Sequence, residues 1–236
     1  MKQLHPVYFA LDFETGEEAL HFLESYQLEG IPVKVGMELF YREGPQIIQK
    51  LKANHHPVFL DLKLHDIPKT VQRAMANLAR LGVDVVNVHA QGGSDMIRAA
   101  REGLEQVDES KRPLLLAVTI LTSSDAAMIQ NELLLSRSLE SMVGHYAEMA
   151  EQNGADGVVC SVKESRLIKE AAGQEFYTLT PGIRLPSGET HDQKRVATPE
   201  EAKKEQSNSI VVGRAIRDAK NPRHAYETVK EAFTNG

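Results

Sequence analysis

The sequence predicts a single α/β domain over residues 1–236, folded as a (β/α)8 or TIM barrel. Three observations lead to this prediction. Eight short runs of apolar, mostly β-branched residues recur along the chain, stretches with helical spacing separate them, and no Ser/Pro/Gly-rich linker interrupts the alternation. A chain of this length also lies in the range where single α/β barrels are common.

The strands are expected where apolar residues follow one another almost without interruption. Such runs are typical of parallel strands, which are buried on both faces. In chain order the runs are 7–11, 31–37, 57–64, 83–90, 113–121, 155–161, 176–183 and 209–216.

Helices are expected in the stretches whose apolar residues follow helical spacing, at 17–26, 44–54, 67–82 and 224–233. The long strand-poor segment 123–154 is interpreted as a short helix followed by a longer one. Gly82 and Gly154 stand just past predicted helix ends, as glycine commonly does, and a strand follows each. The polar segment 186–202, before the last strand, is predicted to be a long loop of the kind that usually carries function in barrels.

Composition and charge exclude several classes of protein. A formal net charge of −6 argues against a general nucleic-acid surface, which needs a basic stripe. The single cysteine, Cys160, cannot form an intrachain disulfide, and neither a signal peptide nor a long apolar span is evident. We therefore predict a cytoplasmic protein that does not interact with membranes.

Polar side chains stand at the predicted strand ends, where barrels of this class have their active sites. In the third strand, Asp61 and Lys63 alternate with leucines and should point to the same face, and Asp66 follows at the turn. Two carboxylates beside an ammonium group would keep it charged. An isolated pair of this kind is more often a surface ion pair, but Lys34 and Asp12 end the two preceding strands. A network of four alternating charges is therefore expected.

A second polar cluster lies near the C-terminus, where Arg184, Gln193, Gly213 and Arg214 follow or flank the last two strands. Barrels often bind phosphate at this place, through backbone N–H groups and a basic side chain. Glycine allows the backbone to approach the phosphate, and the arginine can donate two hydrogen bonds to it. This cluster predicts a phosphate site.

No metal site is predicted. The histidines and the single cysteine show none of the spacings that structural or catalytic metals require. His89, at the end of the fourth strand, could act as a ligand or a base, but a histidine packed in the barrel mouth is the commoner case. We leave it out of the predicted chemistry.

The chain resembles the orotidine 5′-phosphate decarboxylase family in its bacterial form, over residues 6–230. The resemblance is carried by the motifs VKVGMELF, DLKLHDIPKTV, VNVHAQGG, VTILTS, PGIR, DQKRVATP and IVVGRAI, in this order. It implies an enzyme that converts orotidine 5′-phosphate to uridine 5′-phosphate and CO2, the last step of de novo UMP synthesis. It also implies that the enzyme needs no cofactor and works as a homodimer.

The resemblance further implies roles for the charged residues. Lys63 would donate the proton, Asp61 would face the substrate carboxylate, and Lys34 would complete the charged array. Asp66 would act across the dimer interface, with Ile67 and Thr70 reaching into the partner's site.

The remaining family positions are expected to bind the nucleotide. Asp12 and Lys34 would hold the ribose hydroxyls. The pyrimidine would lie by Thr122 and Ser123, Pro181 would also bind the substrate, and the phosphate would be bound by Arg184, Gln193, Gly213 and Arg214. We also expect that binding of the phosphate closes the loop around 182–193 and excludes water, so that a substrate without phosphate would lose turnover as well as affinity.

Two alternatives remain open on the sequence alone. Magnesium-dependent ketogulonate-phosphate decarboxylases and hexulose-phosphate synthases share the strand motif but have an acidic metal ligand near the end of the second strand. Lys34 occupies that region here and would repel Mg²⁺. The other alternative is a non-catalytic nucleotide-binding barrel, which would be expected to lose Lys63 or one of its carboxylates first.

Overall fold

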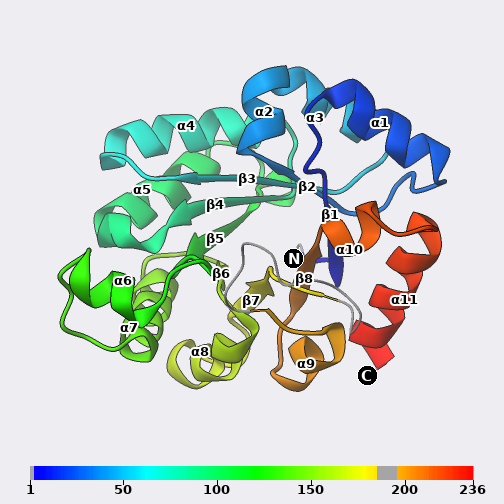
Figure 1. Ribbon diagram of the computed structural model, residues 1–236. Coiled ribbons are helices and arrows are strands. Elements are labelled where there is room, and N and C mark those ends of the chain that lie inside the picture. Colours follow the sequence, from blue (N-terminus) through cyan, green and yellow to red (C-terminus); the bar gives the residue numbers. More distant parts are fainter. Residues whose placement is uncertain (1–2, 185–195, 236) are drawn as a thin grey trace.

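The computed structural model describes residues 3–184 and 196–235. Eight parallel strands hydrogen-bond in sequence order and close into a barrel (Figure 1), which confirms the predicted (β/α)8 fold. The barrel closes where β1 pairs with β8, with Val7 beside Ile210. The strands are β1 (Val7–Ala10), β2 (Val33–Gly36), β3 (Val58–Leu64), β4 (Val85–His89), β5 (Leu114–Val118), β6 (Gly157–Val159), β7 (Tyr177–Thr180) and β8 (Ser209–Val212).

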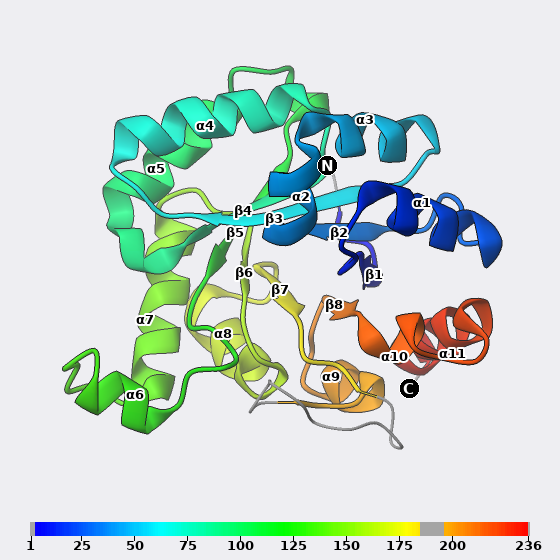
Figure 2. The ribbon, with the colours of Figure 1, turned by 45° about the horizontal axis from the view of Figure 1, so that its top comes forward.

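Helices surround the barrel on its outside, as the two views in Figures 1 and 2 show. They are α1 (Gly16–Ser25), α2 (Met37–Glu43), α3 (Pro45–Ala53), α4 (Pro68–Arg80), α5 (Gly93–Leu104), α6 (Ala126–Asn131), α7 (Leu139–Gln152), α8 (Ser165–Ala172), α9 (Pro199–Lys204), α10 (Arg214–Arg217) and α11 (Pro222–Asn235).

The helix predictions hold with one adjustment. The segment 123–154 contains the short α6 and the longer α7, and Gly82 and Gly154 both have positive φ just past helix ends. Helix α9, however, begins inside the segment predicted to be a loop. Thr198 explains this, because it forms a reciprocal capping box with Glu201 at the start of α9.

Alternate residues of each strand point into the barrel and out toward the helices. In β1, Tyr8 belongs to the inner cluster and Phe9 to the outer one, and both are fully buried. The inner cluster consists of Tyr8, Ala10, Phe59, Val85, Leu114, Leu116, Val118, Val159, Leu179 and Val211. These apolar side chains fill the barrel and form a floor beneath its mouth.

The opposite end of the barrel carries a polar arrangement that occurs three times, which we call the strand clasps. In each, the residue just before an even-numbered strand accepts a hydrogen bond from the first or second backbone N–H of the preceding strand. Asp84 accepts from Val58 N at 2.8 Å, Asp156 from Leu115 N at 2.8 Å, and Asn208 from Thr178 N at 2.9 Å.

A basic side chain completes every clasp: Lys52 lies 2.8 Å from Asp84, Arg112 lies 3.0 Å from Asp156, and Lys169 donates to Asn208 at 2.8 Å. The position before β2 is Pro32, which has no side-chain acceptor. The clasps therefore tie β3 to β4, β5 to β6 and β7 to β8.

In the part of the chain that the structure describes, no helix is both long and apolar enough to span a bilayer.

Candidate active site

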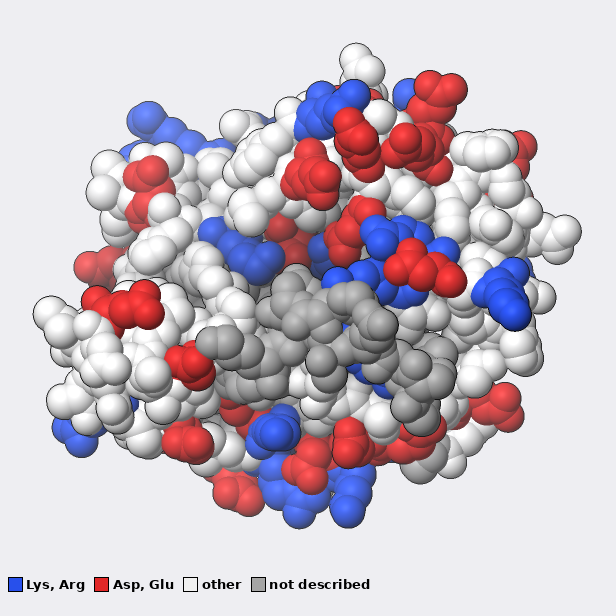
Figure 3. Space-filling model, in the orientation of Figure 1, with Lys and Arg blue, Asp and Glu red and all other residues white. Residues whose placement is uncertain are grey.

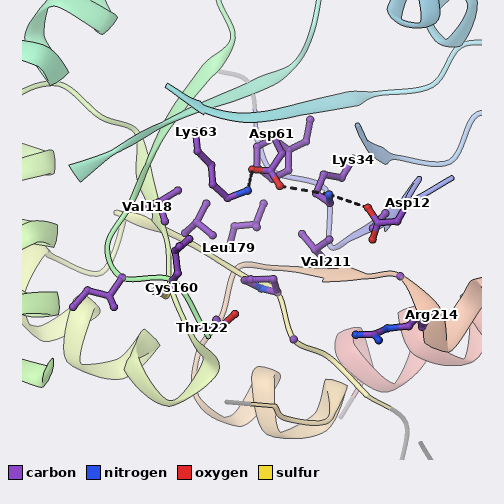
Figure 4. A pocket seen from close by; sticks show the side chains of 18 of the residues that line it. Asp12, Lys34, Asp61, Lys63, Val118, Thr122, Cys160, Leu179, Val211 and Arg214 are labelled. Atoms are coloured by element: carbon purple, nitrogen blue, oxygen red, sulfur yellow. Dashed lines mark hydrogen bonds and ion pairs between the residues drawn. The ribbon is translucent and has the colours of Figure 1, made fainter. Parts of the chain in front are cut away.

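A cavity of about 250 Å³ opens among the carboxyl ends of the strands. Its floor is the apolar inner cluster, and charged side chains stand above the floor (Figure 4). Its polar or glycine lining consists of Asp12, Lys34, Asp61, Lys63, Thr122, Gly182, Arg184, Gly213 and Arg214, and Pro181 also contributes. Most residues predicted to bind the nucleotide thus meet around one cavity.

Four charges form a row along one side of this cavity. Lys34 Nζ lies 3.3 Å from Asp12 Oδ1 and 3.4 Å from Asp61 Oδ2. Lys63 Nζ then donates to Asp61 Oδ1 at 2.7 Å. Figure 4 shows this row, with Arg214 and Thr122 across the pocket from it. Asp12 follows β1, Lys34 lies on β2, and Asp61 and Lys63 lie on β3, which gives the alternating arrangement expected from the sequence.

The two central members of the row hold each other in their charged forms. Burial alone would lower the pKa of Lys34, but the carboxylates of Asp61 and Asp12 outweigh it and raise that pKa above its ordinary value. Burial alone would raise the pKa of Asp61, but Lys34 and Lys63 outweigh it and lower that pKa. The field of this row is therefore fixed before any ligand arrives.

Asp61 and Asp66 do not flank Lys63 within this one chain. Lys63 pairs here with Asp61, and Lys34 is the lysine that lies between two carboxylates of the same chain. Asp66 is exposed, and its Oδ1 accepts a hydrogen bond from Ile67 N at 2.6 Å. The turn after β3 carries Asp66 away from the row.

The backbone of β3 also departs from the extended strand that the alternation of residues predicts. Lys63 has φ of +50°, in the left-handed region that non-glycine residues rarely adopt. Pairing with β4 shifts at the same place: Leu60 is opposite Val86 and Leu64 is opposite Val88. The bulge between these pairs turns the Lys63 side chain into the cavity mouth.

Asn87 is a residue of this site that sequence reasoning missed. It lies on β4 opposite the bulge, is 1% exposed, and hydrogen-bonds both to Lys63 N and to Asp61 Oδ1, each at 2.7 Å. A signal was present in the sequence, because an amide inside the apolar run VDVVNVHA needs buried hydrogen-bond partners.

The opposite side of the cavity is the predicted phosphate side. Arg214 begins α10 directly after Gly213, and Arg184 follows β7, where its Nη1 donates to Ile183 O at 2.8 Å. The face of the molecule in Figure 3 shows basic and acidic side chains side by side near its middle. Gln193, the fourth residue expected here, and most of the loop 182–193 lie outside the described residues.

Four further predicted residues do not line the cavity of this chain: Asp66, Ile67, Thr70 and Ser123. All four are exposed, and the Ile67 side chain is among the most exposed large apolar groups at 68%. The first three follow β3 in the turn and at the start of α4. Their place on the surface leaves them accessible to a second molecule.

The described residues include no three His, Cys, Asp or Glu side chains that converge as metal ligands. His89 packs near His65, with ring centroids 5.7 Å apart. Burial is the main cause that lowers the pKa of His89, and the neighbouring His65 and Lys63 add to the effect.

A closed parallel barrel with a charged row at the carboxyl ends of its strands has the architecture of a TIM-barrel enzyme. The chain belongs to the Orotidine 5'-phosphate decarboxylase / HUMPS family, whose model matches residues 5–229. The resemblance predicted from the sequence motifs is thereby confirmed.

Relatives of known name are similar over almost their whole length. The orotidine 5′-phosphate decarboxylase of Geobacillus sp. (strain WCH70) is 53% identical over 230 residues, which cover 97% of this chain and 96% of that protein. The protein of the same name from Bacillus cereus (strain B4264) is 53% identical over 226 residues, or 95% of each chain.

Solved structures agree with this family. The orotidine 5′-phosphate decarboxylase of Lactobacillus acidophilus matches with a TM-score of 0.85 and 43% identity, covering 98% of this chain and 100% of that one. An uncharacterized conserved protein from Geobacillus kaustophilus matches with a TM-score of 0.87 and 44% identity, covering 97% and 100%.

Proposed function

We propose that this protein decarboxylates orotidine 5′-phosphate to uridine 5′-phosphate and CO2, the last step of de novo UMP synthesis. The family and the names of its relatives support this reaction. The observation that carries the mechanism is the row Asp12–Lys34–Asp61–Lys63 at the cavity, with ion-pair distances of 2.7–3.4 Å.

The substrate has charge at both ends, and so does the cavity. Arg214 and Arg184 can hold the phosphate, with the backbone of Gly213 close by. Asp12 and Lys34 lie where ribose hydroxyls can hydrogen-bond, Thr122 is assigned to the pyrimidine, and Pro181 contributes to the same substrate site. Ser123 follows Thr122 but lies outside the cavity lining of this chain. The orotate carboxylate then lies toward Asp61 and Lys63.

Lys63 is the proton donor in this proposal. When the bond between carbon six and the carboxylate breaks, CO2 leaves and the electron pair stays on carbon six, in the plane of the ring. The ring π system cannot delocalise that pair, so the adjacent ammonium group of Lys63 stabilises it and then transfers a proton to it. The neutral amine regains a proton from solvent after the product leaves.

The geometry lets this stabilisation act without rearrangement. Lys63 is already tied to Asp61 at 2.7 Å, and Lys34 fixes the other oxygen of the same carboxylate. Donors that are oriented in advance need no solvent reorganisation when charge develops, which is commonly the largest electrostatic contribution to catalysis. The chain's own side chains can therefore supply the chemistry without a cofactor.

The active enzyme is proposed to be a homodimer with shared sites. Asp66, Ile67 and Thr70 lie outside this chain's cavity and are exposed, which is consistent with a place in the partner's site. The cytoplasmic location remains a prediction from the sequence.

The first test follows the absorbance of orotidine 5′-phosphate with purified protein in EDTA, for wild type and Lys63→Ala. We expect rapid loss of the substrate signal with wild type. The variant should lose most of the rate acceleration, at least about 10⁴-fold, because it lacks both the proposed proton donor and the ammonium group that stabilises the carbanion.

Two results would contradict the proposal. If wild type leaves orotidine 5′-phosphate intact but acts on ketogulonate 6-phosphate with Mg²⁺, the chain performs the metal-dependent chemistry instead. If it binds UMP without turning over either substrate, the chain is a nucleotide-binding protein.

A further inference from the structure

The bulge in β3 interrupts the pairing with β4 at Lys63, the proposed proton donor. Four residue steps on β3, from Leu60 to Leu64, face only two steps on β4, from Val86 to Val88. Lys63 lies inside this excess and adopts φ of +50°. Residues held in this region persist only when their surroundings fix them, and such residues are common at active sites.

Asn87 is the residue that faces the bulge, because it lies between Val86 and Val88 on β4. Its Oδ1 accepts the backbone N–H of Lys63 at 2.7 Å. The regular ladder between β3 and β4 is interrupted here, so the side chain supplies the acceptor that the neighbouring backbone would otherwise provide.

The NH2 group of the same Asn87 amide hydrogen-bonds to the charged row. Asn87 Nδ2 donates to Asp61 Oδ1 at 2.7 Å, and this is the oxygen that also accepts from Lys63 Nζ. The orientation of the amide follows from its partners, because a backbone N–H requires the oxygen and a carboxylate requires the NH2 group. Asn87 therefore holds the backbone of Lys63 directly, and it holds the ammonium group of Lys63 through the shared oxygen of Asp61.

We infer that Asn87 is a positioning residue that aims Lys63 into the cavity by fixing the bulged backbone and the Asp61 carboxylate together. The inference rests on the proposed function of Lys63 as proton donor. Asn87 does not line the cavity, so it acts through its two neighbours and not through the substrate.

Leucine and aspartate have nearly the same shape as asparagine, but neither can replace the amide of Asn87. Leucine at this position would leave both Lys63 N and Asp61 Oδ1 short of a partner. Aspartate would still accept from Lys63 N, but it would bring a second carboxylate against Asp61, and like charges at this distance repel strongly.

The first test is kinetic and uses Asn87→Leu. We expect kcat for orotidine 5′-phosphate to fall about 10- to 100-fold, with KM changed less than about threefold, because a contact that aims the proton donor acts on the chemical step and not on binding. The matched control is Asn208→Ala, which removes an amide bonded to a strand N–H and to a lysine at the other end of the barrel. That variant should lose stability but keep its kcat.

The second test uses the pH profile of Asn87→Asp. At low pH the introduced carboxyl group can carry a proton and donate it to Asp61, so kcat relative to wild type should rise as pH falls from 8 to 5. The charged or titratable groups nearby are Asp61, Lys34, Lys63, His65 and His89. Because wild type contains all of them, the ratio of the two profiles isolates the new group. A ratio that does not change with pH would contradict the inference.

The third test does not depend on turnover. In a crystal structure of Asn87→Leu we expect Lys63 to leave the left-handed region, or its Nζ to move out of ion-pair range of Asp61. An unchanged Lys63 in that crystal, together with kcat within about twofold of wild type, would overturn the inference. Failure of wild type to act on orotidine 5′-phosphate would overturn the proposed function instead, and the crystal would still test Asn87.

Discussion

Lys34 is the residue on which the charged row depends most. It bridges Asp12 and Asp61, and its side chain is only 13% exposed. Removing it would leave the largely buried Asp61 carboxylate with Lys63 as its remaining cation. A buried charge that loses its partner is costly, because water cannot replace the lost interaction.

Lys34→Met is therefore expected to lower the free energy of unfolding by on the order of 3 kcal/mol at pH 7. In wild type the pKa of Asp61 is lowered in the folded state, so its contribution to stability is present at neutral pH and is lost as the pH falls toward that pKa. Without Lys34 the pKa of Asp61 should be higher than in wild type, because burial still favours the neutral acid and Lys63 alone opposes it, so protonation at low pH relieves part of the cost.

Urea unfolding at pH 7 and pH 5 measures this effect. The free energy of unfolding of Lys34→Met should lie closer to that of wild type at the lower pH. Lys52→Met is the control, because it removes a more exposed pair with Asp84 and should cost no more than about 1 kcal/mol. An equal deficit for Lys34→Met at both pH values would assign the loss to packing instead.

At this scale the sequence predicted which charged residues meet better than it predicted the backbone that holds them. Residue types at strand ends identified Asp12, Lys34, Asp61 and Lys63, because parallel strands of a barrel place their carboxyl ends together. The left-handed backbone of Lys63 could not be predicted, since no glycine or turn motif marks the bulge. The hydrogen bonds of Asn87 depend on that bulge and were missed with it.

At the scale of whole elements, α4 and α5 pack together because one residue has no side chain. A Cβ at Gly103 of α5 would lie 2.2 Å from the backbone oxygen of Gln72 in α4, which is far closer than atoms can approach. Gly144 of α7 is a useful contrast, because a Cβ there would meet nothing within 4 Å.

Gly103→Ala is expected to destabilise the protein by about 1–3 kcal/mol, because the helices must move apart to admit the methyl group. Gly144→Ala should instead stabilise it by up to about 1 kcal/mol, since alanine favours a helix more than glycine does. Chemical unfolding tests whether Gly103→Ala is less stable than wild type and Gly144→Ala more stable. Equal losses in both would show that close packing of α4 against α5 is not the cause.

Most elements could be predicted because their hydrophobic pattern and their packing agree. Each of the eight apolar runs contains a strand, and the two-helix interpretation of 123–154 is confirmed by α6 and α7. The start of α9 was less predictable. There the capping residues Thr198 and Glu201 determine a helix inside a segment whose polar composition indicates a loop.

At the scale of the whole molecule, the proposal that Asp66 serves the partner's site has a direct consequence. A dimer of one Lys63→Ala subunit and one Asp66→Ala subunit would contain one intact site. In that site Lys63 comes from the second subunit and Asp66 from the first.

Mixing the two inactive variants under conditions of subunit exchange should therefore restore about a quarter of the wild-type sites, since half of the dimers become mixed. Steady-state rates before and after mixing measure the gain. Lys63→Ala mixed with Asp61→Asn is the control, because both residues belong to the same subunit's site and no intact site can form. No gain in the first mixture, with both variants still dimeric by light scattering, would show that the sites are not shared.

Closure of the barrel was predictable from the alternation of strands and helices, whereas the assembly was not. Exposed residues such as Ile67 carry no periodic signal that distinguishes an interface from an ordinary surface. The expectation of a dimer came from the family resemblance and remains a proposal.

The strand clasps have a practical meaning for engineering this protein. They lie at the end of the barrel opposite the charged row and bind the β-strands in pairs through Asp84, Asp156 and Asn208. The clasp residues can therefore be changed without touching the cavity residues, because the two sets lie at opposite ends of the same strands. A directed-evolution programme could strengthen the clasp end, for instance by giving the position of Pro32 an acceptor, and then have more freedom to alter the cavity for new substrates.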